Sequence, residues 1–182
     1  YGSPLDAEER RAAITSGEVP VAVYGLGKMG LPLAAVYADV TGNTIGVDID
    51  ESVVRRINAG ESHVKREPGL PELVESVVEA ERLRATADSV AAAEKAAVHV
   101  LMVPTLLDED DDPDLSVLSS VVRDVAEGLS PGDLVVVEST TPPRTTADHV
   151  RPLLVEQSGL DPGTFGVASG PERPASGPAT AD

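Results

Sequence analysis

The sequence predicts an α/β protein with a doubly wound, mainly parallel sheet that carries helices on both faces. Short apolar segments alternate with segments of helical periodicity from Pro20 onward, which is the pattern of repeated strand–helix units. Residues 98–103 and 134–137 are apolar on both faces, as expected of parallel strands covered on both sides. A glycine-rich turn also joins the first predicted strand to the first predicted helix, as in many folds of this class.

The predicted elements follow one another in a regular order. Residues 1–18 are polar and mixed, with a short helical segment near residues 6–14, and we predict that they form an arm ahead of one domain over residues 19–182. Strands are predicted at residues 21–24, 44–47, 84–86, 98–103, 134–137 and 165–168. Helices are predicted between these strands, at residues 28–38, 51–59, 71–80, 89–96, 115–128 and 145–158.

Charge and composition restrict the classes of function. The 182 residues include 31 Asp and Glu against 14 Lys and Arg, a formal net charge of −17, so the surface should repel nucleic acid and anionic membranes. A hydrophobic content of 41% argues against disorder. An acidic chain with few lysines and aromatic residues is typical of a high-salt cytoplasm, so we expect a halophilic, cytoplasmic protein. Neither a membrane-spanning apolar segment nor a signal-peptide pattern is found.

The stretch VAVYGLGKMGLPLA contains the pattern G-x-G-x-x-G at Gly25, Gly27 and Gly30. Gly25 permits a sharp turn, Gly27 leaves room for a pyrophosphate at the positive end of the helix, and Gly30 lets the helix lie close to the sheet. Lys28 and Met29 lie in the same turn. Such glycines also occur in tight turns that bind nothing, but their place between a strand and a helix favours a dinucleotide-binding site.

A carboxylate follows the second predicted strand, as this type of site requires. In NTIGVDID the strand ends at Asp48, shortly after Gly30 in the chain. Its carboxylate can accept both hydroxyls of an adenine ribose and would repel the additional phosphate of NADP. Asp48 could instead cap the following helix, which Asp50 can do equally well. We therefore predict a Rossmann-type domain whose cofactor is NAD.

Four further motifs follow the glycine motif in order: EPGLPELV, MVPT, VVVESTTPP and GPERPASG. Together the five motifs resemble the UDP-glucose/GDP-mannose dehydrogenase family, and the resemblance covers nearly all of residues 21–177. Members of this family oxidise the C6 alcohol of a nucleotide sugar to a carboxylate with two molecules of NAD. The resemblance implies that this chain is the NAD-binding domain of such an enzyme, with a UDP-sugar as the other ligand.

The resemblance also implies roles for residues outside the glycine motif. Pro104 and Thr105 would line the cofactor near its nicotinamide half. Thr140 would lie beside the cofactor and the reacting centre. Glu172 would work near C6 in acid–base or water-orienting chemistry, and Arg173 would face the nucleotide sugar.

Several of these residues have simpler interpretations. Thr105, Ser139 and Thr140 could end strands and cap the helices that follow, and P-E-R could form a surface turn with a salt bridge. Glu138 has two possible interpretations, a residue of the site or a buried, hydrogen-bonded carboxylate. The three histidines are not spaced like metal ligands. The acidic run DEDDDPD lacks the ligand spacing of a Ca²⁺-binding loop. We therefore predict no metal site, and we expect the acidic run to be a solvated loop.

The chain departs from the family's pattern in two loops. Leu106 stands where the family usually has a proline, and Arg144 stands where it usually has a glycine. Because glycine adopts backbone conformations that arginine avoids, we expect the loop of residues 141–145 to be built differently. The P-E-R triplet, where UDP-glucose enzymes usually have P-E-F, favours UDP-N-acetylmannosamine as the substrate.

The family's catalytic Lys, Asn and Cys lie in later parts that this chain does not include. The chain has no cysteine, and a thiolate is needed to trap the aldehyde for a second oxidation. We therefore expect the C-terminal domain of the same protein as a partner, and a homodimer is an option for the full-length protein. The alternatives are a UDP-glucose 6-dehydrogenase, a hydroxyisobutyrate- or 6-phosphogluconate-type dehydrogenase, and a non-catalytic NAD-sensing module.

Overall fold

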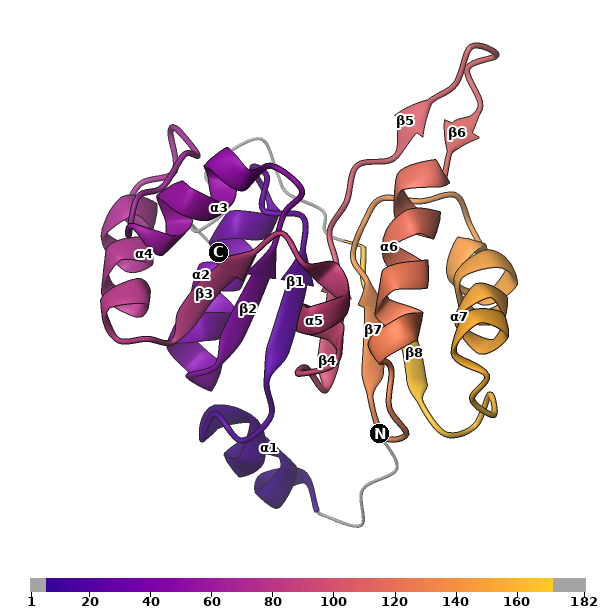
Figure 1. Ribbon diagram of the computed structural model, residues 1–182, viewed down its shortest axis with the longest axis horizontal. Coiled ribbons are helices and arrows are strands. Elements are labelled where there is room, and N and C mark those ends of the chain that lie inside the picture. Colours follow the sequence, from indigo (N-terminus) through magenta and orange to yellow (C-terminus); the bar gives the residue numbers. More distant parts are fainter. Residues whose placement is uncertain (1–5, 172–182) are drawn as a thin grey trace.

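The structure is a computed structural model that describes residues 6–171 (Figure 1). A six-stranded sheet lies at its centre, with the strand order β3-β2-β1-β4-β7-β8 and parallel pairing throughout. Its strands are β1 (Val21–Tyr24), β2 (Thr44–Val47), β3 (Leu83–Thr86), β4 (Val98–Leu101), β7 (Leu134–Val137) and β8 (Gly166–Ser169). The predicted doubly wound α/β fold is therefore confirmed.

Helices form one layer on each face of the sheet, and each layer has its own hydrophobic core. One layer consists of α2 (Gly30–Thr41), α3 (Glu51–Asn58) and α4 (Leu70–Glu79). The other consists of α5 (Ser89–Ala93), α6 (Ser116–Gly128) and α7 (Arg151–Ser158). In Figure 1, α6 lies in front of the sheet and α2 lies behind it.

The strand order creates a crevice at one edge of the sheet. From β1 the chain winds to β2 and β3, and it then crosses to β4 on the other side of β1. The carboxyl ends of β1 and β4 are therefore neighbours from which the chain departs in opposite directions. Doubly wound sheets bind ligands at this point.

Local signals set the ends of several elements. Asp50 caps α3, and its carboxylate accepts the N–H of Ser52 at 2.8 Å. Gly42 ends α2 in the left-handed conformation, with a φ of 76°. The helix predicted at residues 145–158 begins with a π-helical turn at Thr146–Val150 before α7.

The fourth strand is shorter than predicted. Residues 98–103 were expected, but β4 ends at Leu101. Leu101 is the last residue of β4 to pair with either neighbour, opposite Tyr24 in β1 and Val137 in β7. The apolar pattern continues to Val103, but pairing stops because the two flanking strands have ended.

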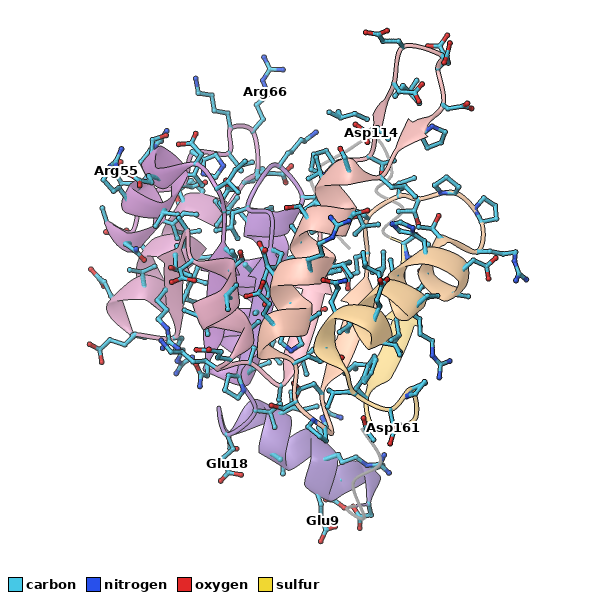
Figure 2. All side chains as sticks on the ribbon, turned by 45° about the vertical axis from the view of Figure 1, so that its right-hand side comes forward. Glu9, Glu18, Arg55, Arg66, Asp114 and Asp161 are labelled. Carbon is cyan, nitrogen blue, oxygen red and sulfur yellow. The ribbon has the colours of Figure 1, made fainter. Side chains whose placement is uncertain are left out.

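The prediction of a solvated loop for the acidic run is wrong in part. A short antiparallel hairpin pairs β5 (Leu106–Leu107) with β6 (Pro113–Asp114), and it projects from the body of the molecule (Figure 1). The acidic residues form its turn, where Asp108 Oδ1 accepts the N–H groups of Asp110 and Asp112 at 2.9 and 3.0 Å. Figure 2 shows Asp114 and Arg66 at the same end of the molecule, opposite the end where Glu9 and Glu18 lie.

The predicted arm contains the helix expected near residues 6–14, here α1 (Ala7–Thr15). Asp6 caps it, and the side chain of Glu9 accepts the Asp6 N–H in return. The helix has no buried residue, and the division of the chain into an arm and a domain at residue 19 stays a prediction. Over residues 6–171, no helix combines the length and the apolar character needed to cross a membrane.

Candidate functional site

The first glycine of the motif makes the turn out of β1. Gly25 has a φ of 94°, a conformation that side chains disfavour, and a Cβ there would overlap the carbonyl oxygen of Met102. Its N–H donates to the carbonyl of Val47 at 2.7 Å, which ties the turn to the end of β2. The predicted role of Gly25 in a sharp turn therefore fits its geometry.

The third glycine allows α2 to start directly against this turn. A Cβ at Gly30 would overlap the carbonyl oxygen of Gly25, and that neighbour is backbone that cannot rotate away. Helix α2 begins at Gly30, and Met29 at its N-cap position makes no side-chain cap. Leu31 and Leu33 already donate their N–H groups to the carbonyls of Gly27 and Met29, at 3.1 and 3.3 Å. In the described structure the N–H groups of residues 27–30 have no such acceptor, so these are the ones left for a ligand.

Gly27 differs from both neighbours because nothing lies within 4 Å of where its Cβ would be. It lines two cavities of about 500 and 720 Å³ on either side of the turn. A dinucleotide has two nucleoside halves joined by a pyrophosphate, so two cavities that meet at an open glycine match its shape. The open position of Gly27 between two cavities is the observation that most directly supports a dinucleotide as the ligand.

Asp48 follows β2 and lines the smaller cavity, which we call the adenosine-side cavity because Asp48 is predicted to bind the adenine ribose. Its Oδ2 accepts the N–H of Leu26 at 2.9 Å, and its Oδ1 accepts the N–H of Asp50 at 3.0 Å. The cap of α3 is Asp50, so the alternative that Asp48 is only a helix cap is wrong. Each carboxylate oxygen has a second lone pair, which leaves acceptors for ribose hydroxyls.

The larger cavity brings together the remaining predicted cofactor residues in the described part of the chain. It is lined by Lys28, Met29, Pro104, Thr105 and Thr140, among others. Thr105 Oγ1 is buried and has no hydrogen-bond partner in the described structure. A buried hydroxyl without a partner is costly, and a bound ligand would supply one.

The alternative that the threonines cap helices is also wrong. Thr105 is followed by β5, and the π-helical turn after β7 has Thr145 rather than Thr140 at its N-cap position. Ser139 has a structural role, because its Oγ accepts the N–H of Val103 at 2.9 Å and donates to the carbonyl of Leu101 at 3.2 Å. Thr140 is exposed in the cavity beside it.

One residue of the larger cavity, Glu138, forms a contact with α2 that the sequence did not indicate. Tyr37 of α2 donates its hydroxyl to Glu138 Oε1 at 3.3 Å, and Glu138 lines the cavity. The two residues are 101 positions apart, so no local signal connects them. Glu138 is thus half-buried and hydrogen-bonded, yet it also faces the site.

The loop after Thr140 does not avoid the conformation that suits glycine. Arg144 has a φ of 72°, in the left-handed region. Its guanidinium forms two hydrogen bonds with Asp148, at 2.7 and 2.8 Å. Arg144 thus adopts a backbone conformation that glycine favours and pairs with Asp148, and the expectation that the loop differs from that of the family stays a prediction.

A buried polar chain lies beneath the adenosine-side cavity. The Tyr24 hydroxyl is 3.1 Å from Nδ1 of His99, and His99 Nε2 is 3.6 Å from Oδ2 of Asp133. Burial raises the pKa of the Tyr24 hydroxyl, and the Asp124 and Asp133 carboxylates raise it further, so the tyrosine keeps its proton. Tyr24 can therefore donate to Nδ1, whereas the buried Nε2 of His99 has no hydrogen-bond partner in the described structure.

The predicted substrate residues Glu172 and Arg173 lie outside the described residues. The parallel sheet, the glycine turn between β1 and α2, and the carboxylate after β2 together define a Rossmann-type dinucleotide-binding domain. The NAD-binding domain model of the UDP-glucose/GDP-mannose dehydrogenase family matches residues 19–182. The chain belongs to this family, and it is an NAD-binding domain.

Named relatives differ in the sugar they act on. UDP-N-acetyl-D-mannosamine dehydrogenase of Pyrococcus horikoshii is 40% identical over 154 residues, 84% of this chain and 36% of the relative. NDP-N-acetyl-D-galactosaminuronic acid dehydrogenase of Ralstonia nicotianae is 42% identical over 122 residues, 67% of this chain and 28% of the relative. The structure of a UDP-glucose dehydrogenase from the archaeon Pyrobaculum islandicum has a TM-score of 0.81 at 32% identity, covering 88% of this chain and 37% of that one. The chain spans about a third of the length of these relatives.

Proposed function

We propose that the protein containing this chain oxidises the C6 alcohol of UDP-N-acetylmannosamine to the carboxylate, using two molecules of NAD. The observation that carries the proposal is the 40% identity, over 84% of the chain, to a protein named UDP-N-acetyl-D-mannosamine dehydrogenase. The P-E-R triplet supports the same sugar. UDP-glucose is the second candidate substrate, supported by the likeness to the Pyrobaculum islandicum enzyme.

In this proposal each of the two cavities binds a different half of NAD. Gly25, Gly27 and Gly30 shape the pyrophosphate site, and Asp48 binds the adenine ribose in the adenosine-side cavity. The larger cavity, with Lys28, Met29, Pro104, Thr105 and Thr140, holds the nicotinamide half, which when bound accepts a hydride. The hydroxyl of Thr140 lies beside the reacting C6 centre.

Glu172 and Arg173 complete the proposed substrate side. Glu172 handles a proton or orients water near C6, and Arg173 faces the nucleotide sugar. Oxidation of an alcohol to a carboxylate removes two hydrides and consumes one water, and the aldehyde between the two steps must be held. Since the chain has no cysteine, we propose that a thiolate from a further domain of the same protein traps it.

The test compares full-length protein with this chain by absorbance at the NADH band. Full-length protein should form two NADH per UDP-N-acetylmannosamine and less with UDP-glucose, and Glu172→Gln should lower turnover far more than NAD affinity. The 182-residue chain should bind NADH without turnover, because half a cleft cannot hold the reacting groups in place. Full-length protein that binds NADH but oxidises no nucleotide sugar would favour the NAD-sensing alternative.

A further inference from the structure

The adenosine-side cavity contains a carboxylate that the glycine turn and Asp48 leave unexplained. Asp124 lies on α6, three residues after Val121 and seven after Val117. The three residues have the spacing i, i+4, i+7 and therefore share one face of the helix. All three line this cavity. Two apolar side chains and a carboxylate are therefore presented together from one element.

The structure holds this carboxylate in one orientation. Ser89, the first residue of α5, donates its hydroxyl to Asp124 Oδ2 at 2.5 Å. Within residues 6–171, Oδ1 of Asp124 makes no hydrogen bond and is not buried. Ser89 thus fixes one oxygen of Asp124, and the other is left to accept a hydrogen bond in the cavity.

The rest of the cavity wall suits a flat ring. Ile49 directly follows Asp48, lines the cavity and is 93% exposed, which is unusual for so large an apolar side chain. Together with Val117 and Val121 it supplies apolar surface near the ribose carboxylate. A purine attached to that ribose has apolar faces that such walls would cover.

We propose that Asp124 accepts a hydrogen bond from the exocyclic N6 amine of the adenine of NAD, and that it thereby selects adenine over 6-oxo purines. This inference rests on NAD binding by the domain. Adenine presents an amino group at this position, whereas guanine presents a keto oxygen, as hypoxanthine does. An ionised carboxylate only accepts hydrogen bonds, so it complements the amine and repels the oxygen. Ser89 is the positioning residue for this contact.

The experiment measures the binding of NADH and of reduced nicotinamide hypoxanthine dinucleotide by calorimetry. The parent chain should bind NADH about tenfold more tightly than the hypoxanthine cofactor, the factor expected for one hydrogen bond to a charged acceptor. Asp124→Ala should lower NADH affinity by about tenfold and bring the ratio close to one. Asp124→Asn should improve hypoxanthine binding, because its amide can donate to the keto oxygen and still accept from Ser89.

Glu127→Ala is the matched control, because it removes the same charge from an exposed position on α6 that does not line the cavity. It should leave the ratio of the two affinities as in the parent. An unchanged ratio in both Asp124 variants would overturn the inference alone and leave NAD binding standing. Failure of the parent to bind either cofactor would overturn NAD binding by the chain and the inference with it. Melting curves of all variants confirm that they are folded.

Discussion

Gly27 and Gly30 lie in the same turn, yet the structure implies opposite consequences when each is replaced by alanine. At Gly27 an added Cβ would meet no atom within 4 Å, and the residue is not in the left-handed region. Gly27→Ala should therefore change the free energy of unfolding by less than about 0.5 kcal/mol, as for an ordinary surface substitution. The methyl group would, however, occupy the opening between the two cavities.

NADH binding by Gly27→Ala should weaken by at least about tenfold, or 1.4 kcal/mol. The reason is that the pyrophosphate would have to withdraw from N–H donors, and hydrogen bonds to a charged group are each worth about 1.5–3 kcal/mol. Gly30→Ala is the matched control. Its Cβ would overlap the Gly25 carbonyl oxygen, and such overpacking costs about 1–3 kcal/mol, or more where backbone cannot move.

Thermal unfolding and calorimetric titration with NADH separate the two effects. At about 2–4 °C per kcal/mol for a domain of this size, Gly30→Ala should lower the melting temperature by roughly 2–12 °C. Gly27→Ala should melt as the parent does. The reasoning would be refuted if Gly27→Ala melted as low as Gly30→Ala, or if it bound NADH as tightly as the parent.

Three further predictions concern the ribose carboxylate, the loop and the charge. Asp48→Ala should weaken NAD binding by about one to two powers of ten, and the parent should bind NADP much less well than NAD; equal affinities in calorimetry would contradict this. Arg144→Gly removes the backbone strain of a left-handed arginine, which should stabilise the fold by about 1 kcal/mol. It also loses an exposed ion pair worth about 0–1 kcal/mol, so its melting temperature should equal or exceed the parent's. Arg144→Ala loses the Asp148 pair but keeps the strain, and it should melt below Arg144→Gly; the reverse order would refute the account. With a net charge of −17, the melting temperature should rise from tens of millimolar to molar KCl, and a flat profile would remove the high-salt hypothesis.

The sequence predicted the elements whose signals are local and repeated. Apolar segments gave the central strands to within one or two residues, and residues such as Asp50 marked a helix start through a cap contact two residues away. The β5–β6 hairpin was missed because each strand is only two residues long and its turn is made by carboxylates that accept their own neighbours' N–H groups. The early end of β4 at Leu101 depends on where its neighbours stop, which the apolar pattern does not reveal.

The residues of the candidate site also fall into those that the sequence could place and those that it could not. Gly27, Asp48 and Thr140 could be placed from the sequence because the carboxyl ends of neighbouring parallel strands meet at one edge of the sheet. The contact between Ser89 and Asp124 depends on how α5 packs against α6, so sequence spacing does not indicate it. The helical periodicity of α6 gives one indication, because it places Asp124 on the same face of the helix as Val117.

An acidic chain that binds an anionic cofactor must separate its charges from the phosphates. In the proposed binding mode, the phosphates would meet the backbone N–H groups of residues 27–30, which attract anions without adding to the net charge. Lys28 is the only cation among the residues that line the two cavities in the described chain. The carboxylates of Asp48 and Asp124 line the adenosine-side cavity, where the proposed ribose and adenine would bring hydroxyl and amine donors. If the cofactor binds as proposed, N–H donors and Lys28 would lie near its phosphates and carboxylates near its hydroxyl and amine donors. An acidic surface would then be compatible with binding of the dinucleotide.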